Sequence, residues 1–197
     1  MRRHASIGLG LGAAALLGSA PAAAHTFGAQ GAGFAAGFGH PLLGLDHLLA
    51  MVAVGLWAAQ LGGRAVWRVP AAFVAALAAG ASLALAGVPL PAVEPGIMAS
   101  VLALGLLVAF AVRLPSWAGM AVVALFALCH GHAHGAEMPQ AAHPLLYGLG
   151  FVLASVLLHG VGIGLGLGAG RLAAPTLTRV AGAAVASVGL WAVLVAG

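Results

Sequence analysis

The sequence predicts an all-α protein, a polytopic membrane helix bundle with six transmembrane helices after a cleaved signal peptide. The first reason is composition: of 197 residues, 63% are hydrophobic and 5% are charged, and the mean hydropathy is +1.14. A soluble domain of this length cannot bury so much apolar surface, so a membrane protein is the class that fits. The other two reasons are the N-terminal leader and a series of long apolar segments.

The N-terminus has the features of a secretory signal peptide. Two arginines precede an apolar run over 7–17, and small residues precede a cleavage point between Ala24 and His25. This run is shorter than the ~20 residues that a transmembrane helix needs; an uncleaved first span is the alternative. We therefore expect residues 1–24 to be removed and residues 25–197 to form one six-helix transmembrane domain.

Six further segments are long enough to cross ~30 Å of hydrocarbon, and joints with glycine or proline separate them. They are residues 41–61, 69–87, 95–112, 116–136, 144–168 and 176–196. If the mature N-terminus lies outside, all five remaining arginines fall in cytoplasmic joints, as the positive-inside rule requires. We expect a multi-pass protein of the bacterial inner (plasma) membrane with both mature termini in the periplasm.

Charge and cysteine usage exclude other classes. The formal net charge of +4 comes from arginines without any lysine, and these arginines are scattered rather than gathered into a basic patch with aromatic residues. We therefore expect no nucleic-acid partner. Cys129 is the only cysteine, so an internal disulfide is excluded. The lipid bilayer is an expected partner, and the oligomeric state stays open, with a homo-oligomer as one option.

Ionisable residues inside membrane spans are energetically expensive and mark functional sites. The first such group, "HPLLGLDH" at 40–47, places Asp46 and His47 about two turns into the first span. His40 precedes His47 by about two helical turns, so the two share a face if the helix extends that far. Asp46 is expected either to ligate a metal or to orient a ligating histidine by accepting its hydrogen bond.

The second group, "CHGHAHGAE" at 129–137, closes the fourth span. In a helix, His130, His134 and Glu137 lie on one stripe, while His132 points to the opposite side. Both groups lie at similar depth from the outer ends of their spans. We therefore expect two half-sites that meet at one level if these helices pack together.

Imidazole nitrogens with carboxylates suit Ni²⁺, Zn²⁺, Cu²⁺ or Co²⁺, and they suit Mg²⁺ and Ca²⁺ poorly. The expected metal-handling residues are His40, Asp46, His47, His130, His134 and Glu137. Secondary candidates are His25, His132, His159 and Cys129. His25 would carry a free α-amino group after cleavage, and His159 lies deeper, in the fifth span. An ordinary structural role is the alternative for His25, His132 and Cys129. No permanent cofactor is expected.

Both groups resemble signatures of the HupE/UreJ family of membrane proteins. Residues 40–47 match its H-x5-D-H signature, and residues 129–137 resemble its F-H-G-x-[A/V]-H-G-x-E signature, with Cys129 in place of phenylalanine. A sulfur ligand would favour copper or zinc more than phenylalanine could. Family members are encoded with nickel hydrogenases or ureases and are regarded as nickel permeases. Across essentially the whole chain, the resemblance implies that the six main candidates handle Ni²⁺.

Three functions follow as hypotheses. The first is a permease that moves Ni²⁺ from the periplasm to the cytoplasm, without enzymatic activity. The second is an intramembrane zinc hydrolase, whose zinc activates water and is held by Asp46, His47, His130 and His134. The third is a metal sensor or chaperone without transport. A permease needs polar groups that continue inward, and His159 mildly favours it.

Overall fold

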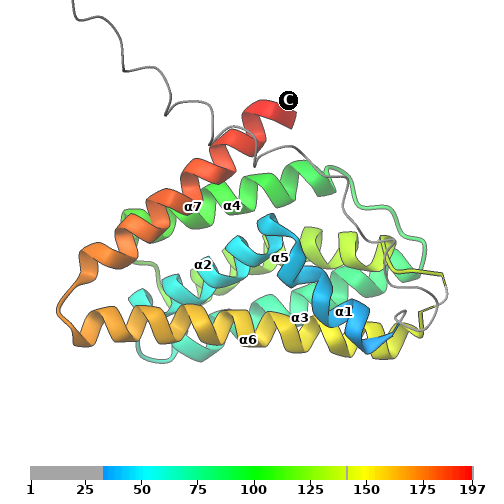
Figure 1. Cartoon of the computed structure of the whole chain (residues 1–197), viewed down its shortest axis with the longest axis horizontal. Helices are drawn as coiled ribbons and strands as arrows, with labels where there is room; N and C mark the ends of the chain where they lie inside the picture. Colours follow the sequence, from blue (N-terminus) through cyan, green and yellow to red (C-terminus); the bar gives the residue numbers. More distant parts are fainter. Residues whose placement is uncertain (1–32, 141, 197) are drawn as a thin grey trace, which may run out of the picture.

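The computed structural model describes residues 33–140 and 142–196 and is all-α over this part of the chain (Figure 1). The expected signal peptide and His25 lie outside the described residues. The helices, in chain order, are α1 (Phe34–Leu43), α2 (Leu45–Leu61), α3 (Ala65–Leu85), α4 (Val93–Ala109), α5 (Ser116–Ala136), α6 (Pro144–Arg171) and α7 (Pro175–Ala196).

Four of these helices, α3, α5, α6 and α7, are long and apolar enough to cross a membrane. The pair α1 and α2 meets this criterion only when its two helices are taken together, and α4 is apolar but has 17 residues, about 25 Å at the α-helical rise. Large side chains such as Leu125, Leu165 and Leu194 are exposed, as expected of surfaces that face lipid. The all-α membrane class is therefore confirmed, whereas six complete spans stay a prediction.

The expectation of one continuous helix over 41–61 is wrong. The chain bends by 81° between α1 and α2, and Gly44 between them has extended backbone (φ −80°, ψ 109°). A Cβ atom at Gly44 would lie 3.1 Å from Asp46 Oδ1, so the missing side chain leaves room for that carboxylate. Residues 34–39, which precede the first expected span, are helical as well. The apolar pattern runs through the glycine without a break, which hides the bend.

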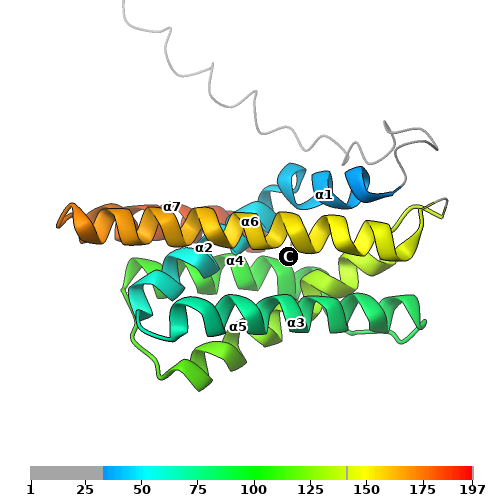
Figure 2. The ribbon, with the colours of Figure 1, turned by 90° about the horizontal axis from the view of Figure 1, so that it is seen from below.

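Glycines bring the long helices into close contact. A Cβ atom at Gly131 of α5 would overlap the carbonyl oxygen of Leu77 in α3, and Gly55 of α2 faces Gly162 of α6 in the same way. Small residues at such positions allow helix backbones to approach closely in a membrane. The main pairs are α3 with α5, α2 with α6, and α4 with α7. Figure 2 shows α1 beside α6, on the side away from α3 and α5.

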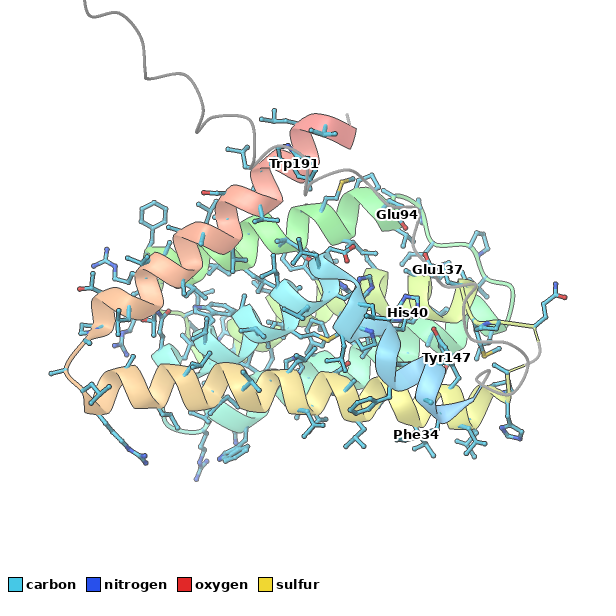
Figure 3. All side chains as sticks on the ribbon, in the orientation of Figure 1. Phe34, His40, Glu94, Glu137, Tyr147 and Trp191 are labelled. Atoms are coloured by element: carbon cyan, nitrogen blue, oxygen red, sulfur yellow. The ribbon has the colours of Figure 1, made fainter. Side chains whose placement is uncertain are left out.

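The charged residues separate toward the two ends of the bundle. The junctions α2–α3, α4–α5 and α6–α7 lie at the left end in Figure 1, whereas Glu94 and Glu137 lie toward the opposite end in Figure 3. In or near the left-hand junctions are Arg64, Arg68, Arg113, Arg171 and Arg179. This separation agrees with the positive-inside pattern. The orientation of the chain in the membrane remains a prediction.

Candidate functional site

Four histidines from three helices meet in one cluster at the end of the bundle that carries the two glutamates. His40 lies in the last turn of α1, His47 in the first turn of α2, and His130 and His134 in the last two turns of α5. The ring centroid of His134 is 4.6 Å from that of His40 and 4.5 Å from that of His47. The His47 and His130 centroids are 4.7 Å apart. We call these four rings the histidine cluster; the two sequence groups do lie together.

The bend at Gly44, rather than a shared helix face, brings His40 near His47. A spacing of two helical turns places two residues on one face only within one helix, and the chain bends by 81° between His40 and His47. The expected shared helix face is therefore wrong. Their ring centroids nevertheless lie 5.9 Å apart. The break thus turns α1 so that its single histidine, His40, reaches the cluster beside the start of α2.

Asp46 holds His47 in a defined orientation. Its Oδ1 accepts hydrogen bonds from the His47 backbone N–H at 2.8 Å and from the His47 ring Nδ1 at 2.9 Å. An ionised carboxylate only accepts, so Nδ1 of His47 carries a proton, and in the neutral ring the lone pair is on Nε2. A carboxylate in the first turn also satisfies a free backbone N–H and interacts favourably with the helix dipole. Of the two expected roles for Asp46, this geometry favours orienting a histidine.

The outer edge of the cluster is a hydrogen-bonded group of His40, Glu137 and Tyr147, which gather at the right in Figure 3. His40 Nε2 lies 3.2 Å from Glu137 Oε2, and His40 Nδ1 lies 3.2 Å from the Tyr147 hydroxyl. The bond with His40 lowers the pKa of Glu137 below its ordinary value, despite partial burial that acts in the other direction. Both nitrogens of His40 are engaged, so His40 ligates a metal only if it releases one partner.

His134 lies at the centre of the cluster. Its side chain is 0% exposed, and its ring stacks on Phe151 of α6, with centroids 5.0 Å apart and an interplanar angle of 7°. The stacking covers one face of the His134 ring and leaves the ring edge, which carries both nitrogens, uncovered by Phe151. The aromatic neighbour therefore limits the orientations that His134 can adopt.

Several buried ring nitrogens lack a hydrogen-bond partner among the described residues. They are His47 Nε2, His130 Nδ1, and both nitrogens of His134 and His159. Buried polar atoms are nearly always paired, and each exception calls for an explanation. Lone pairs on buried imidazoles are suitable donors for a borderline transition metal. The donor set therefore fits an ion of this class.

The rings are not arranged as a finished chelate. Within residues 33–140 and 142–196, no three His, Cys, Asp or Glu side chains are placed to hold one ion together. The cluster rings meet edge to face at 67° to 89°, so joint coordination of one ion requires rotation of side chains.

Two secondary candidates lie apart from the cluster. His132 points away from it, as expected, and its Nε2 lies 3.0 Å from the carbonyl oxygen of Val88, between α3 and α4. Cys129 faces Gly96 of α4, where its sulfur would lie 2.6 Å from an added Cβ atom. Neither residue is brought to the four rings.

His159 lies deeper, and the ring of Phe73 contacts both His159 and His130. Its side chain is 2% exposed, and its ring centroid is 4.9 Å from that of Phe73, which in turn lies 6.0 Å from that of His130.

Two residues of the site were not anticipated from the sequence: Tyr147, bonded to His40, and Ser100, whose Oγ lies 2.8 Å from His130 Nε2. Tyr147 is the only tyrosine of the chain, which was a usable signal. Ser100 offered a weaker one, as a hydroxyl within an apolar segment.

Comparison with known proteins agrees with this picture. Residues 13–192 match the profile of a protein family described as "HupE / UreJ protein". Protein HupE of Rhizobium leguminosarum bv. viciae is 47% identical over 170 residues, which cover 86% of this chain and 89% of that protein. No solved structure is significantly similar. Because the family match includes both histidine groups and nearly the whole chain, the protein belongs to the HupE/UreJ family.

Proposed function

We propose that the protein is an inner-membrane permease that moves Ni²⁺ from the periplasm to the cytoplasm, with Co²⁺, Zn²⁺ or Cu²⁺ as further ions that its donor set can bind. The observation that carries this proposal is the histidine cluster, with its buried ring nitrogens that lack partners among the described residues. The HupE/UreJ family is associated with nickel or cobalt uptake for hydrogenase and urease, and its members are not known enzymes.

The order of the polar groups supports a route through the bundle. Glu137 lies at the end of the bundle where the described residues include no arginine (Figure 3), and Asp46 is bonded there to His47 of the cluster; carboxylates at this end attract a cation. From there an ion exchanges water for the imidazoles of the histidine cluster and continues past Phe73 to His159. Such sites must bind well enough to dehydrate the ion and weakly enough to release it. Side chains that coordinate one ion only after rotation meet this requirement.

Polar groups also continue toward the end that carries the arginines. Gln60, near the end of α2, donates from Nε2 to the carbonyl oxygen of Val108 at 3.0 Å and to Thr178 Oγ1 at 3.2 Å. Its Oε1 is buried and has no partner within the described part of the chain. An amide oxygen here offers a weak last contact before release. A permease requires such inward continuation, whereas a metal sensor does not.

A zinc hydrolase is supported less well. It needs an open coordination position beside a groove that admits a substrate. Two cavities of the bundle, of about 480 Å³ and 620 Å³, are lined mainly by apolar residues of α2, α4, α6 and α7, and no histidine lines either of them. The permease is therefore the function that the geometry supports best.

The test is uptake of radioactive nickel by the purified protein in sealed, metal-free vesicles. We expect nickel to accumulate inside, beyond the reach of an external chelator, and His130→Ala to abolish this uptake. His143→Ala is the matched control, because His143 is an exposed residue before α6 without a side-chain capping bond. Nickel that an external chelator removes completely would indicate a binding protein and contradict transport.

The orientation and the cleaved leader belong to the same proposal. N-terminal sequencing of the protein extracted from membranes should begin at His25. A chain that begins at Met1 would contradict both the signal peptide of residues 1–24 and a metal-capturing role for the N-terminal His25. Competition with Co²⁺, Zn²⁺ and Cu²⁺ in the vesicle assay ranks the ions directly.

A further inference from the structure

Ser100 of α4 is a buried hydroxyl shared between its own helix and the histidine cluster. Its Oγ lies 2.6 Å from the carbonyl oxygen of Ile97 and 2.8 Å from His130 Nε2. Both Ser100 and His130 are 0% exposed, so water does not compete for either bond. These are the only polar contacts that the described residues provide to this hydroxyl.

The count of protons decides the direction of each bond. A carbonyl oxygen only accepts, so the single hydroxyl proton of Ser100 goes to Ile97. Ser100 Oγ must then accept from His130, which requires the proton of the neutral imidazole to sit on Nε2. The lone pair is left on Nδ1, the nitrogen that is buried and without a partner in the part of the chain described.

We propose that Ser100 is a positioning residue that holds His130 as its Nε2–H tautomer and thereby presents Nδ1 to the transported metal ion. The hydrogen bond made by the other ring nitrogen commonly selects which nitrogen of a histidine ligates. Asp46 acts on His47 in the opposite sense, since it holds the proton on Nδ1 and leaves Nε2 free. The two neighbouring rings thus offer different nitrogens, each set by a partner outside the cluster.

This role rests on the proposed transport, but the tautomer itself can be measured without any metal. The protein, labelled with ¹⁵N-histidine, is examined by NMR in lipid bilayers at a pH where imidazoles are neutral. The His130 signals are identified by their loss in His130→Ala. We expect the Nε2–H form in the unmodified protein and a shift toward the Nδ1–H form, or a mixture, in Ser100→Ala.

Ser155→Ala is the matched control. Ser155 is also 0% exposed and donates to a carbonyl oxygen of its own helix, that of Phe151, at 2.7 Å, but no bond to a histidine is present among its described contacts. Loss of a buried helical serine alone should therefore leave the His130 signals unchanged. An Nδ1–H form in the unmodified protein would overturn the proposal, even if Ser100→Ala folds poorly. An unchanged His130 tautomer in Ser100→Ala would overturn it as well.

Uptake then tests the consequence for the ion. Because loss of a residue that orients a metal ligand typically weakens binding about 10–100-fold, the half-saturating nickel concentration should rise by roughly tenfold or more in Ser100→Ala and stay within about twofold in Ser155→Ala. Equal kinetics in both variants would overturn the positioning role. If the tautomer is as expected but the unmodified protein moves no nickel, transport fails and the assignment of the proton stands.

Discussion

Replacement of Asp46 by asparagine tests whether this carboxylate orients His47. The amide oxygen of Asn can still accept from the two N–H groups that Oδ1 now binds at 2.8 Å and 2.9 Å, but without negative charge. Bonds to charged groups are worth about 1.5–3 kcal/mol and neutral ones about 0.5–1.5 kcal/mol. Because the Asp46 side chain is 44% exposed, solvent screens part of this difference, and we take about 1–2 kcal/mol in total.

This loss corresponds to roughly 5–30-fold weaker orientation of the His47 Nε2 lone pair toward an ion. We therefore expect the half-saturating nickel concentration of Asp46→Asn to rise by about that factor, measured as initial uptake into vesicles at equal protein content. Glu94→Gln, in the first turn of α4 and away from the described histidine bonds, should change uptake little.

Three outcomes would refute this reasoning. Unchanged kinetics in Asp46→Asn would show that the orientation of His47 does not limit binding. An equal loss in Glu94→Gln would point to surface charge or folding. Loss of all saturable uptake, at any nickel concentration, would identify Asp46 as a direct ligand instead.

Further predictions concern helical phase, protonation and packing. His130→Ala should abolish uptake at equal expression, whereas His132→Ala should cause a mild defect, because His132 faces Val88; equal defects would mean that the end of α5 wraps the ion as a loop. Uptake should fall toward acidic external pH, since a protonated imidazole does not bind metal, and uptake that rises as the external pH falls would contradict histidine ligands. Gly131→Ala should lower the free energy of unfolding by more than about 1 kcal/mol, because the added methyl group overpacks against α3. Gly160→Ala has open space at its Cβ position and should be neutral or slightly stabilising. The temperature at which each variant loses monodispersity in detergent compares the two.

Much of the fold followed from local patterns. The segment expected over 116–136 coincides with α5, and the one over 176–196 differs from α7 by one residue at its start. Apolar runs bounded by glycine and proline are properties of neighbouring residues, so they are legible without a structure. Of the expected stripe of His130, His134 and Glu137, the two histidines share a face of α5, because i and i+4 do so in any helix, and Glu137 follows as the C-cap residue.

The first helix shows where this reasoning stops. Leucines flank Gly44 on both sides, and a lone glycine is tolerated in many helices, so the bend at Gly44 was not predicted from the local pattern. His40 reaches the cluster because α1 turns away from α2 and packs on α6. Its partner Tyr147 lies 107 positions away in the sequence, and no periodicity links the two.

By itself, the sequence determined the membrane class, the positions of the apolar helices, the separation of arginines from glutamates, and the two histidine groups, since each of these depends on composition or on spacing within one segment. Only the tertiary structure decided that Glu137 and Tyr147 bind His40, that Asp46 holds His47, and that Ser100 binds His130. The physical reason is that the state of an imidazole depends on which partner reaches each nitrogen. Except for Asp46, that partner comes from a helix or helix end packed alongside, and packing between distant segments is not encoded in the pattern of either segment alone.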